Sequence, residues 1–208
     1  KIKNLPGLSI STSGPGATNM ITSICNCFYE SIPCVFLSGN INSKFMRPHG
    51  RIRQIGFQET DLVSIVESIS KYAVCIKDPK DIKYELEKSY FLSTSGRCGP
   101  VVWDIPMDIQ KADVNVETLV GFDSSAFELR YNFQEIEKKV INFFEDLMKS
   151  KRPAILAGGG LRVTNNIERF NNILEKLKIP TFVTWNGIDV VASDSDYYGG
   201  RVGTYGGP

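Results

Sequence analysis

The chain has 208 residues, of which 42% are hydrophobic and 23% charged, and these proportions exclude a disordered, collagen-like or coiled-coil chain. Lysine and arginine total 24 against 23 acidic residues, so the chain has almost no net charge with which to hold nucleic acid or an anionic membrane surface. Its apolar stretches are far shorter than the roughly 20 residues of a membrane helix, and no signal segment opens the chain. We therefore expect neither nucleic acid nor a membrane as a partner.

The cysteines and the single histidine predict no metal site. The cysteines form an odd set without a CxxC pair, and several lie in apolar runs, which indicates reduced core residues of a cytoplasmic protein. His49 has no partner with which to complete a zinc site or a Ser-His-Asp triad, so we interpret it as a surface-loop residue. The cysteines are Cys25, Cys27, Cys34, Cys75 and Cys98.

Strands and helices alternate along the first half of the chain. Apolar runs predict strands at residues 8–12, 34–37, 72–76 and 101–105. Helical spacing predicts helices from Ala17, over 59–68, and from Asp78 with a stripe of Ile82, Leu86, Tyr90 and Phe91. A long polar loop over residues 38–56 carries Arg47, Arg51 and Arg53, and loops of this length are often functional. The alternation predicts right-handed βαβ units and a parallel sheet.

A polar, aperiodic stretch predicts a linker, after which a second α/β region begins. Its helices are expected at residues 134–149 and 167–177, and its strands at 154–157 and 181–184. The predicted domains are 1–110, a linker over 111–133, and an incomplete Rossmann-like domain over 134–208. Both termini resemble cut ends, so we expect a segment of a longer polypeptide.

Four segments could carry chemistry. Residues 12–19, Thr-Ser-Gly-Pro-Gly-Ala-Thr-Asn, lie between a strand and a helix, where open α/β sheets bind ligands and helix amides bind anions; a plain capped turn is the alternative. Gln58 could present an amide to a bound ring beside Phe57, although Glu59 could equally lie in a solvated helical turn and Phe57 in the core. Arg97, between glycines, suits a phosphate or a planar ring, or is a solvated loop charge.

The fourth segment, Gly158-Gly159-Gly160, follows a strand as in nucleotide-binding turns, but three glycines alone are weak evidence. Lys71, just before a strand, is either a positioned cation or a solubilising charge at a strand edge.

Seven segments share an order and spacing with one family: TSGPGATN at 12–19, SIP at 31–33, FQET at 57–60, ISK at 69–71, SGRCGP at 95–100, DIPMDIQ at 104–110, and RP at 152–153 followed by GGG at 158–160. Together they resemble the thiamine diphosphate-dependent acetolactate synthase family over nearly the whole chain. That resemblance implies a pyrimidine-binding domain followed by the start of the central domain, without the diphosphate-binding domain.

The resemblance also implies roles for individual residues. Thr12, Pro15 and Asn19 match residues that border the aminopyrimidine of the cofactor, and Gln58 matches the active-site glutamine. Phe57 and Lys71 match residues of the substrate channel, so Gln58, Lys71 and Phe57 are the candidate catalytic residues. The positions that match FAD contacts in flavin-carrying members are Arg97, Gly158, Gly159, Gly160, Thr184, Trp185, and the run 199–202, which includes Gly200 and Arg201.

The implied reaction is decarboxylation of pyruvate and transfer of the hydroxyethyl unit to a 2-keto acid acceptor. The implied cofactors are thiamine diphosphate, Mg2+ held through a domain not present here, and FAD in some members. By the same resemblance the protein is expected to be a homodimer or a higher homo-oligomer, because the family builds each active site from two subunits.

Three departures from the family pattern qualify this expectation. The catalytic glutamate of the family would precede Lys1, and its GDG…NN metal signature is absent, so the isolated segment is predicted to be inactive. The run 52–56, Ile-Arg-Gln-Ile-Gly, replaces a common Gly-Thr-Asp-Ala, and Met107 replaces a common lysine. Val202 stands where flavin members often have histidine.

Two alternatives follow. The local sequence around Arg51 and Arg53 resembles relatives from surface-sugar pathways, so the acceptor could be a nucleotide-activated keto-sugar. The chain could also be a non-catalytic binding or assembly module that kept the fold.

Overall fold

The structure is a computed structural model that describes residues 5–48, 52–127 and 131–203. The chain divides into two compact units, Lys1–Leu129 and Arg130–Pro208, and each is described here by itself. The predicted roles of His49 and Arg51 concern positions outside the described residues.

The first unit is built on a four-stranded parallel sheet with the strand order β1-β2-β4-β3. This arrangement confirms the predicted α/β class. The apolar runs become strands because strands buried on both faces favour apolar side chains, and β4 is buried at every position, with Asp104 as its one charged residue. The strands are β1 (Gly7–Ser11), β2 (Cys34–Asn40), β3 (Tyr72–Cys75) and β4 (Pro100–Pro106).

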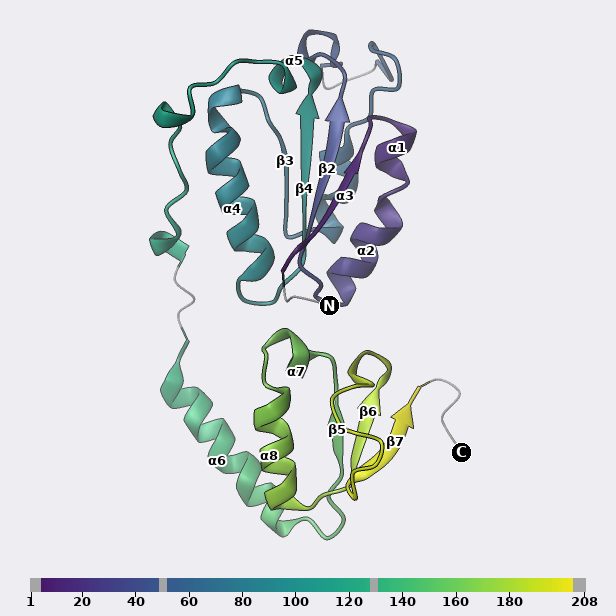
Figure 1. The fold of residues 1–208 in the computed structure, drawn as a ribbon, viewed down its shortest axis with the longest axis vertical. Helices are drawn as coiled ribbons and strands as arrows, with labels where there is room; N and C mark the ends of the chain where they lie inside the picture. The colour runs from purple at the N-terminus through teal and green to yellow at the C-terminus, as the bar shows by residue number, and fades with distance from the viewer. Residues whose placement is uncertain (1–4, 49–51, 128–130, 204–208) are drawn as a thin grey trace. The chain divides into compact units, whose positions relative to one another are not determined.

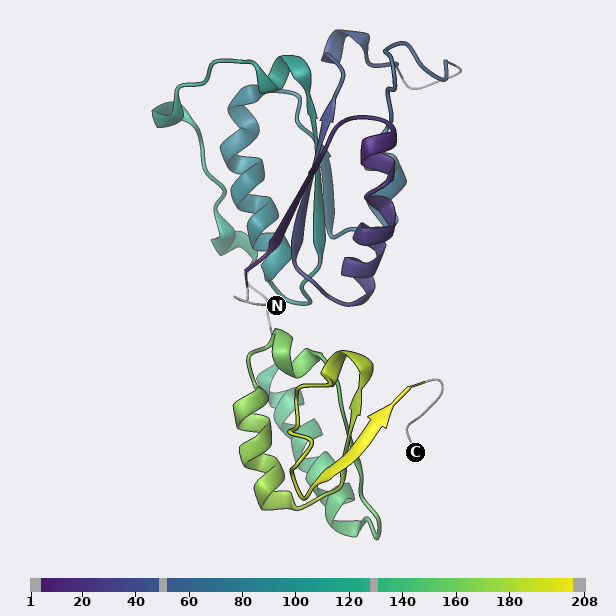
Figure 2. The ribbon, with the colours of Figure 1, turned by 45° about the vertical axis from the view of Figure 1, so that its right-hand side comes forward.

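Helices cover both faces of this sheet (Figures 1 and 2). One core, which includes Ile24, Phe36 and Val66, joins the sheet to α1, α2 and α3. The other core, around Trp103 and Ile105, lies on the face of α4. The α-helices are α1 (Pro15–Thr18), α2 (Ile21–Tyr29), α3 (Leu62–Val66), α4 (Ile82–Thr94) and α5 (Met107–Gln110), and the 3-10 turns are η1 (Ser43–Phe45), η2 (Glu67–Ile69), η3 (Pro79–Asp81), η4 (Val116–Thr118) and η5 (Ser124–Phe127).

Two helix predictions are corrected at their starts. The helix expected over 59–68 begins only at Leu62, because Asp61 caps it by accepting the amide of Ser64 at 3.2 Å. The single helix expected from Ala17 is two pieces, with Asn19 at the C-cap of the short α1. A helix of four residues has little macrodipole, so the expected anion site at its amino end loses much of its physical basis.

The predicted apolar stripe of α4 is also corrected. Leu86 and Tyr90 are 53% and 51% exposed, whereas Ser89 and Ser93 are fully buried. The indole Nε1 of Trp103 donates to Ser89 Oγ at 2.6 Å, and Ser93 Oγ donates to the carbonyl of Gly99 at 2.8 Å. Two small, hydrogen-bonded side chains thus face the sheet where larger apolar side chains were expected.

The segment predicted as a linker packs in part on the first unit. Phe122 lies against Tyr84 of α4, with 5.5 Å between ring centroids, and its amide donates to Glu87 at 2.7 Å. Phe91 and Phe127 complete this aromatic cluster. The aperiodic sequence is therefore a packed connection over these residues.

The second unit contains a three-stranded parallel sheet of order β5-β6-β7. Its core joins Ala157, Val183 and Val190 to Leu174 of α8. The strand β7 has no counterpart in the sequence-based expectations. The elements are α6 (Phe133–Lys149), β5 (Ile155–Ala157), α7 (Gly160–Val163), α8 (Ile167–Leu177), β6 (Thr181–Thr184), η6 (Trp185–Gly187) and β7 (Tyr198–Val202).

The cysteines are all free, but of the five only Cys34 is buried, so the expectation of core positions is correct for one residue. Over the described ranges, none of the helices has the length and apolar character needed to cross a membrane. In the same ranges, no group of three or more His, Cys, Asp or Glu side chains could hold a metal ion.

Candidate functional site

The turn after β1 and the loop before α3 meet at the carboxyl edge of the first sheet. Gly14 has φ +61°, and a Cβ atom placed on it would lie 2.6 Å from the carbonyl oxygen of Gln58 and 2.8 Å from its Cβ. Only glycine fits this approach. The structure therefore brings Gln58 within van der Waals contact of the predicted Thr12–Asn19 turn.

The other residues of that turn lie close to Gly14 in the structure. Pro15 opens α1, and the amide of Asn19 donates to its carbonyl at 3.1 Å. A Cβ on Gly16 would lie 2.7 Å from the methyl group of Thr12, so the turn is tightly packed. Thr12, Pro15 and Asn19 all have exposed side chains and can meet a ligand.

Two cavities open at this carboxyl edge. One, of about 340 Å³, lies at the ends of β1, β2 and β4, and its lining includes Thr12, Asn40 and Met107. Phe57, which is 81% exposed, lies beside Gln58 in the loop and is not the core plug that the alternative required. This end of the sheet thus carries a cavity bordered by the hydroxyl group of Thr12, and nearby an exposed amide at Gln58 and an exposed ring at Phe57, groups that are common in ligand sites.

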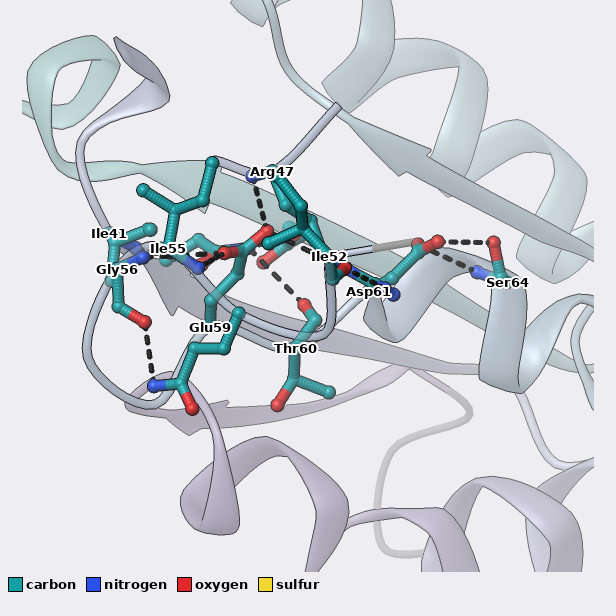
Figure 3. Close-up of polar contacts among 12 residues, drawn as sticks. Ile41, Arg47, Ile52, Ile55, Gly56, Glu59, Thr60, Asp61 and Ser64 are labelled. Atoms are coloured by element: carbon teal, nitrogen blue, oxygen red, sulfur yellow. Dashed lines mark hydrogen bonds and ion pairs between the residues drawn. The ribbon is translucent and has the colours of Figure 1, made fainter. Parts of the chain in front are cut away.

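Glu59 organises the loop that carries Phe57 and Gln58 (Figure 3). Its side chain is 4% exposed, which corrects the alternative of a solvated helical residue. Oε1 accepts the amide of Arg47 at 2.6 Å, and Oε2 accepts those of Ile55 and Gly56 at 3.0 and 3.4 Å. Burial opposes ionisation, but these amides and the nearby Arg47 guanidinium hold the pKa of Glu59 below its ordinary value.

A second buried carboxylate lies in the adjacent cavity, which measures about 360 Å³ and is lined by Asp104, Cys75 and Arg47 among others. Asn40 Nδ2 donates to Asp104 Oδ2 at 2.6 Å between β2 and β4. Burial raises the pKa of Asp104 to about 7, against the lowering effect of the Asn40 amide. This carboxyl group can therefore exchange a proton near neutral pH.

Lys71 and Arg97 lie at the other edge of the first sheet. Lys71 precedes β3, and its Nζ donates to the carbonyl of Ser95 at 2.7 Å. Arg97 Nε donates to Ser31 Oγ at 2.8 Å. All strands of this sheet are parallel, so their amino and carboxyl ends lie at opposite edges.

Within this unit the sheet therefore separates Lys71 from Gln58 and Phe57, and the catalytic role expected of Lys71 stays a prediction. Lys71 and Arg97 instead line a cavity of about 280 Å³ with Phe28, Tyr29 and Cys98. Burial lowers the pKa of Lys71, partly opposed by Cys98.

In the second unit, the predicted flavin residues from Gly158 to Gly160, together with Thr184 and Trp185, lie at the carboxyl ends of β5 and β6, and Gly200 and Arg201 lie within β7. Gly158 lies against Thr184, because a Cβ atom added on Gly158 would lie 3.6 Å from Thr184 Oγ1. Gly159 lies against Asn186. Arg201 pairs with Val183 in the sheet, next to Gly200 with φ +106°. Trp185 is 79% exposed, and Gly160 opens α7. The glycine turn and the Thr184–Trp185 segment are more than 20 positions apart in the sequence, and the parallel pairing of β5 with β6 brings them together.

Sequence reasoning missed three contributors to the first site: the buried network of Glu59, the Asn40–Asp104 pair, and Met107 as a cavity-lining residue. Met107 was noted only as a departure from a family pattern. The position of Glu59 directly after Gln58, a predicted site residue, was the one sequence feature that could have pointed to it. Asn40 and Asp104 are 64 positions apart and gave none.

Comparison with known proteins gives two family matches. Residues 1–65 match the thiamine pyrophosphate enzyme N-terminal TPP binding domain, and residues 140–208 match the thiamine pyrophosphate enzyme central domain. Thiamine pyrophosphate and thiamine diphosphate are the same compound. The two matched segments fall in the first and the second unit, respectively.

Similar individual proteins include the acetolactate synthase isozyme 2 large subunit of Escherichia coli K12, 30% identical over 96% of this chain and 34% of that protein. The acetolactate synthase large subunit of Lactococcus lactis is also 30% identical, over 96% of this chain and 33% of its own length. A glyoxylate carboligase of Escherichia coli O157:H7 is 29% identical over 95% of this chain and 32% of its length. The chain thus spans about a third of these relatives. The chain thus contains matches to the N-terminal and central domains of thiamine pyrophosphate enzymes, which agree with its parallel α/β units, and it is similar to acetolactate synthase large subunits.

Proposed function

We propose that this chain supplies the pyrimidine-binding part of a thiamine diphosphate-dependent carboligase. The observation that carries the proposal is the van der Waals contact between Gln58 and Gly14, which joins two family motifs at one sheet edge. Thr12, Pro15 and Asn19 would border the pyrimidine ring, and Gln58 would offer its amide to the ring or the substrate. Phe57 would cover the site and exclude water.

The residues fit such a ring on physical grounds. The Gly14 approach leaves no space for any side chain, while the neighbouring cavity and the exposed Gln58 and Asn19 leave polar groups available. When bound, thiamine diphosphate supplies an electron sink for decarboxylation of a 2-keto acid. The part of this chain is then to orient the ring and to keep fixed polar groups beside the reacting atoms.

The substrates that we propose are pyruvate as donor and a 2-keto acid as acceptor, in line with the names of the acetolactate synthase relatives. A nucleotide-activated keto-sugar is the alternative acceptor. Arg53 is exposed and could meet its phosphates, whereas Arg47 already donates to the carbonyl of Ile52 at 3.1 Å. We assign no Mg2+ ligand to the described residues. A homo-oligomeric, cytoplasmic enzyme completes the proposal.

FAD is proposed as a second cofactor, held at the carboxyl edge of the second unit by the turn of Gly158, Gly159 and Gly160 and by Thr184 and Trp185. The run that includes Gly200 and Arg201 is a further candidate for this ligand within the second unit, and the FAD contact expected of Arg97, in the first unit, stays a separate prediction. A yellow purified protein with flavin absorbance would support this part, and a colourless protein that binds no added FAD would refute it.

The test is a titration of the complete gene product with thiamine diphosphate and Mg2+, followed by reaction with pyruvate and 2-ketobutyrate. We expect saturable binding, and Gln58→Ala should weaken binding or turnover about tenfold or more while Gln134→Ala, an exposed control, changes neither. No cofactor binding would favour the non-catalytic module. Binding and decarboxylation without an acetohydroxy acid product would favour the keto-sugar acceptor.

A further inference from the structure

Glu59 connects two distant parts of the loop that precedes Gln58. One carboxylate oxygen accepts the amide of Arg47, near the start of the loop, and the other accepts the amides of Ile55 and Gly56, near its end (Figure 3). Only 4% of the Glu59 side chain is exposed, so the carboxylate itself is largely shielded from water. Hydrogen bonds from backbone amides to a carboxylate are stronger than those between neutral groups.

Gln58, the residue next to this carboxylate, has an unfavourable backbone conformation. Its φ of +58° lies in the left-handed region, which residues other than glycine, asparagine and aspartate seldom adopt. Such a conformation persists only where surrounding contacts impose it. The same conformation sets the carbonyl of Gln58 against Gly14, so the loop must be held for the two motifs to meet.

The amides are the principal partners of Glu59. The Arg47 guanidinium Nε lies 3.8 Å from Oε1, too far for a good hydrogen bond, whereas the Arg47 amide is at 2.6 Å. Gln54 adds a further bond within the loop, from its Nε2 to the carbonyl of Gly56 at 2.7 Å. The carboxylate thus fixes main-chain geometry, and neutralising a cation is a minor part of what it does.

We propose that Glu59 is a positioning residue, which fixes the loop before it so that Gln58 stays against the Gly14 turn and presents its side chain to the cofactor site. This inference rests on the proposed function for its catalytic consequence. The part that concerns the loop stands on the structure alone, and the two parts have separate tests.

The first test needs no cofactor. Hydrogen exchange of the amides of Arg47, Ile55 and Gly56 is compared between the native protein and Glu59→Gln. Glutamine keeps one acceptor oxygen and replaces the other with an NH2 donor. Either the Arg47 amide or the Ile55 and Gly56 amides therefore lose their acceptor and should exchange at least about tenfold faster. Glu67→Gln, at an exposed glutamate in η2, is the matched control and should leave the rates unchanged.

The second test asks whether Glu59 acts through Gln58. In the holoenzyme, Glu59→Gln should lower kcat about tenfold to a hundredfold, with a smaller change in KM, because misplaced catalytic groups mainly affect turnover. In the Gln58→Ala background the same substitution should have almost no additional effect. A residue that only stabilises the fold would instead lower activity by the same factor in both backgrounds.

The outcomes separate clearly. Unchanged amide exchange in Glu59→Gln would overturn the inference, as would additive kinetic effects of the two substitutions. If Glu59→Gln fails to fold, Glu59→Asp replaces it, because it keeps the charge but is one methylene too short to reach both amide groups, and the same expectations apply. Failure of the native protein to bind thiamine diphosphate would refute the proposed function, while the exchange measurement would still decide whether Glu59 holds the loop.

Discussion

The two edges of the first sheet use polar residues in opposite ways. At the amino edge, Lys71 donates a hydrogen bond to a backbone carbonyl and Arg97 donates one to a serine hydroxyl, both within the same unit. At the carboxyl edge, the backbone is tightly held while the side chains of Asn19, Phe57 and Gln58 remain exposed. Held backbone with available side chains is the arrangement that a ligand site needs, because binding then orders few groups.

The comparison also shows where buried charge is placed. Glu59 is ionised readily because amides surround it, whereas burial leaves Asp104 with a pKa near neutrality. Both carboxylates lie at or near the carboxyl edge. Substitutions at each edge can therefore test whether function is confined to one of them.

The largest effect is expected at Gly14. In Gly14→Ala the new methyl group would meet the carbonyl of Gln58 at 2.6 Å in a backbone conformation with φ +61°. We expect a loss of about 2–3 kcal/mol in the free energy of unfolding, measured by urea denaturation. Thiamine diphosphate affinity should fall as well. Gly203→Ala, where no atom lies within 4 Å of the added carbon, is the control.

If Gly14→Ala had the stability and cofactor affinity of the native protein, the contact between the turn and Gln58 would not exist in solution, and the carboxyl edge would lose its special status.

Asp104→Asn should change how stability depends on pH. The carboxyl pKa is about 7 in the folded state, above the ordinary value near 3.9, so the folded state binds the extra proton and native stability should fall as pH rises from about 4 to about 7. Asparagine keeps an acceptor for Asn40 Nδ2 and carries no charge. At pH 8 the variant should be more stable by about 1 kcal/mol.

Thermal denaturation across this pH range measures the effect, with Asp81→Asn as an exposed control in the same unit. An identical pH dependence in Asp104→Asn and the native chain would show that the pKa of Asp104 is the same in the folded and the unfolded state, against the expected rise.

The smallest effect is expected at the amino edge. Lys71→Met keeps the hydrocarbon stem that packs on Gly99 and removes only the bond to Ser95, so we expect a loss of about 1 kcal/mol or less in stability. The affinity for thiamine diphosphate and the value of kcat should not change. A kcat reduced tenfold or more in a stable variant would return Lys71 to the catalytic group and contradict the distinction between the edges.

Much of the fold could be predicted from local sequence. The strands predicted at residues 34–37 and 101–105 lie within β2 and β4, and α8 has the bounds that its helical spacing predicts. The motifs at residues 12–19 and 57–60 also supplied the principal candidate site residues, which the structure brings into contact at Gly14 and Gln58. The face of α4 could not be predicted, because the burial of Ser89 depends on a hydrogen bond from Trp103 in a distant strand. Hydrophobic periodicity does not register such a partner.

The candidate site follows the same rule. The glycine turn, the Phe-Gln-Glu run and the triple glycine are local patterns, so the sequence by itself determined the family resemblance and which residues are candidates for the site. Only the tertiary structure decided that Gln58 lies against Gly14, that Lys71 lies across the sheet from it, and that Glu59 is buried. The physical reason is that strand order and burial come from contacts between residues far apart in the chain, and no local spacing specifies those contacts.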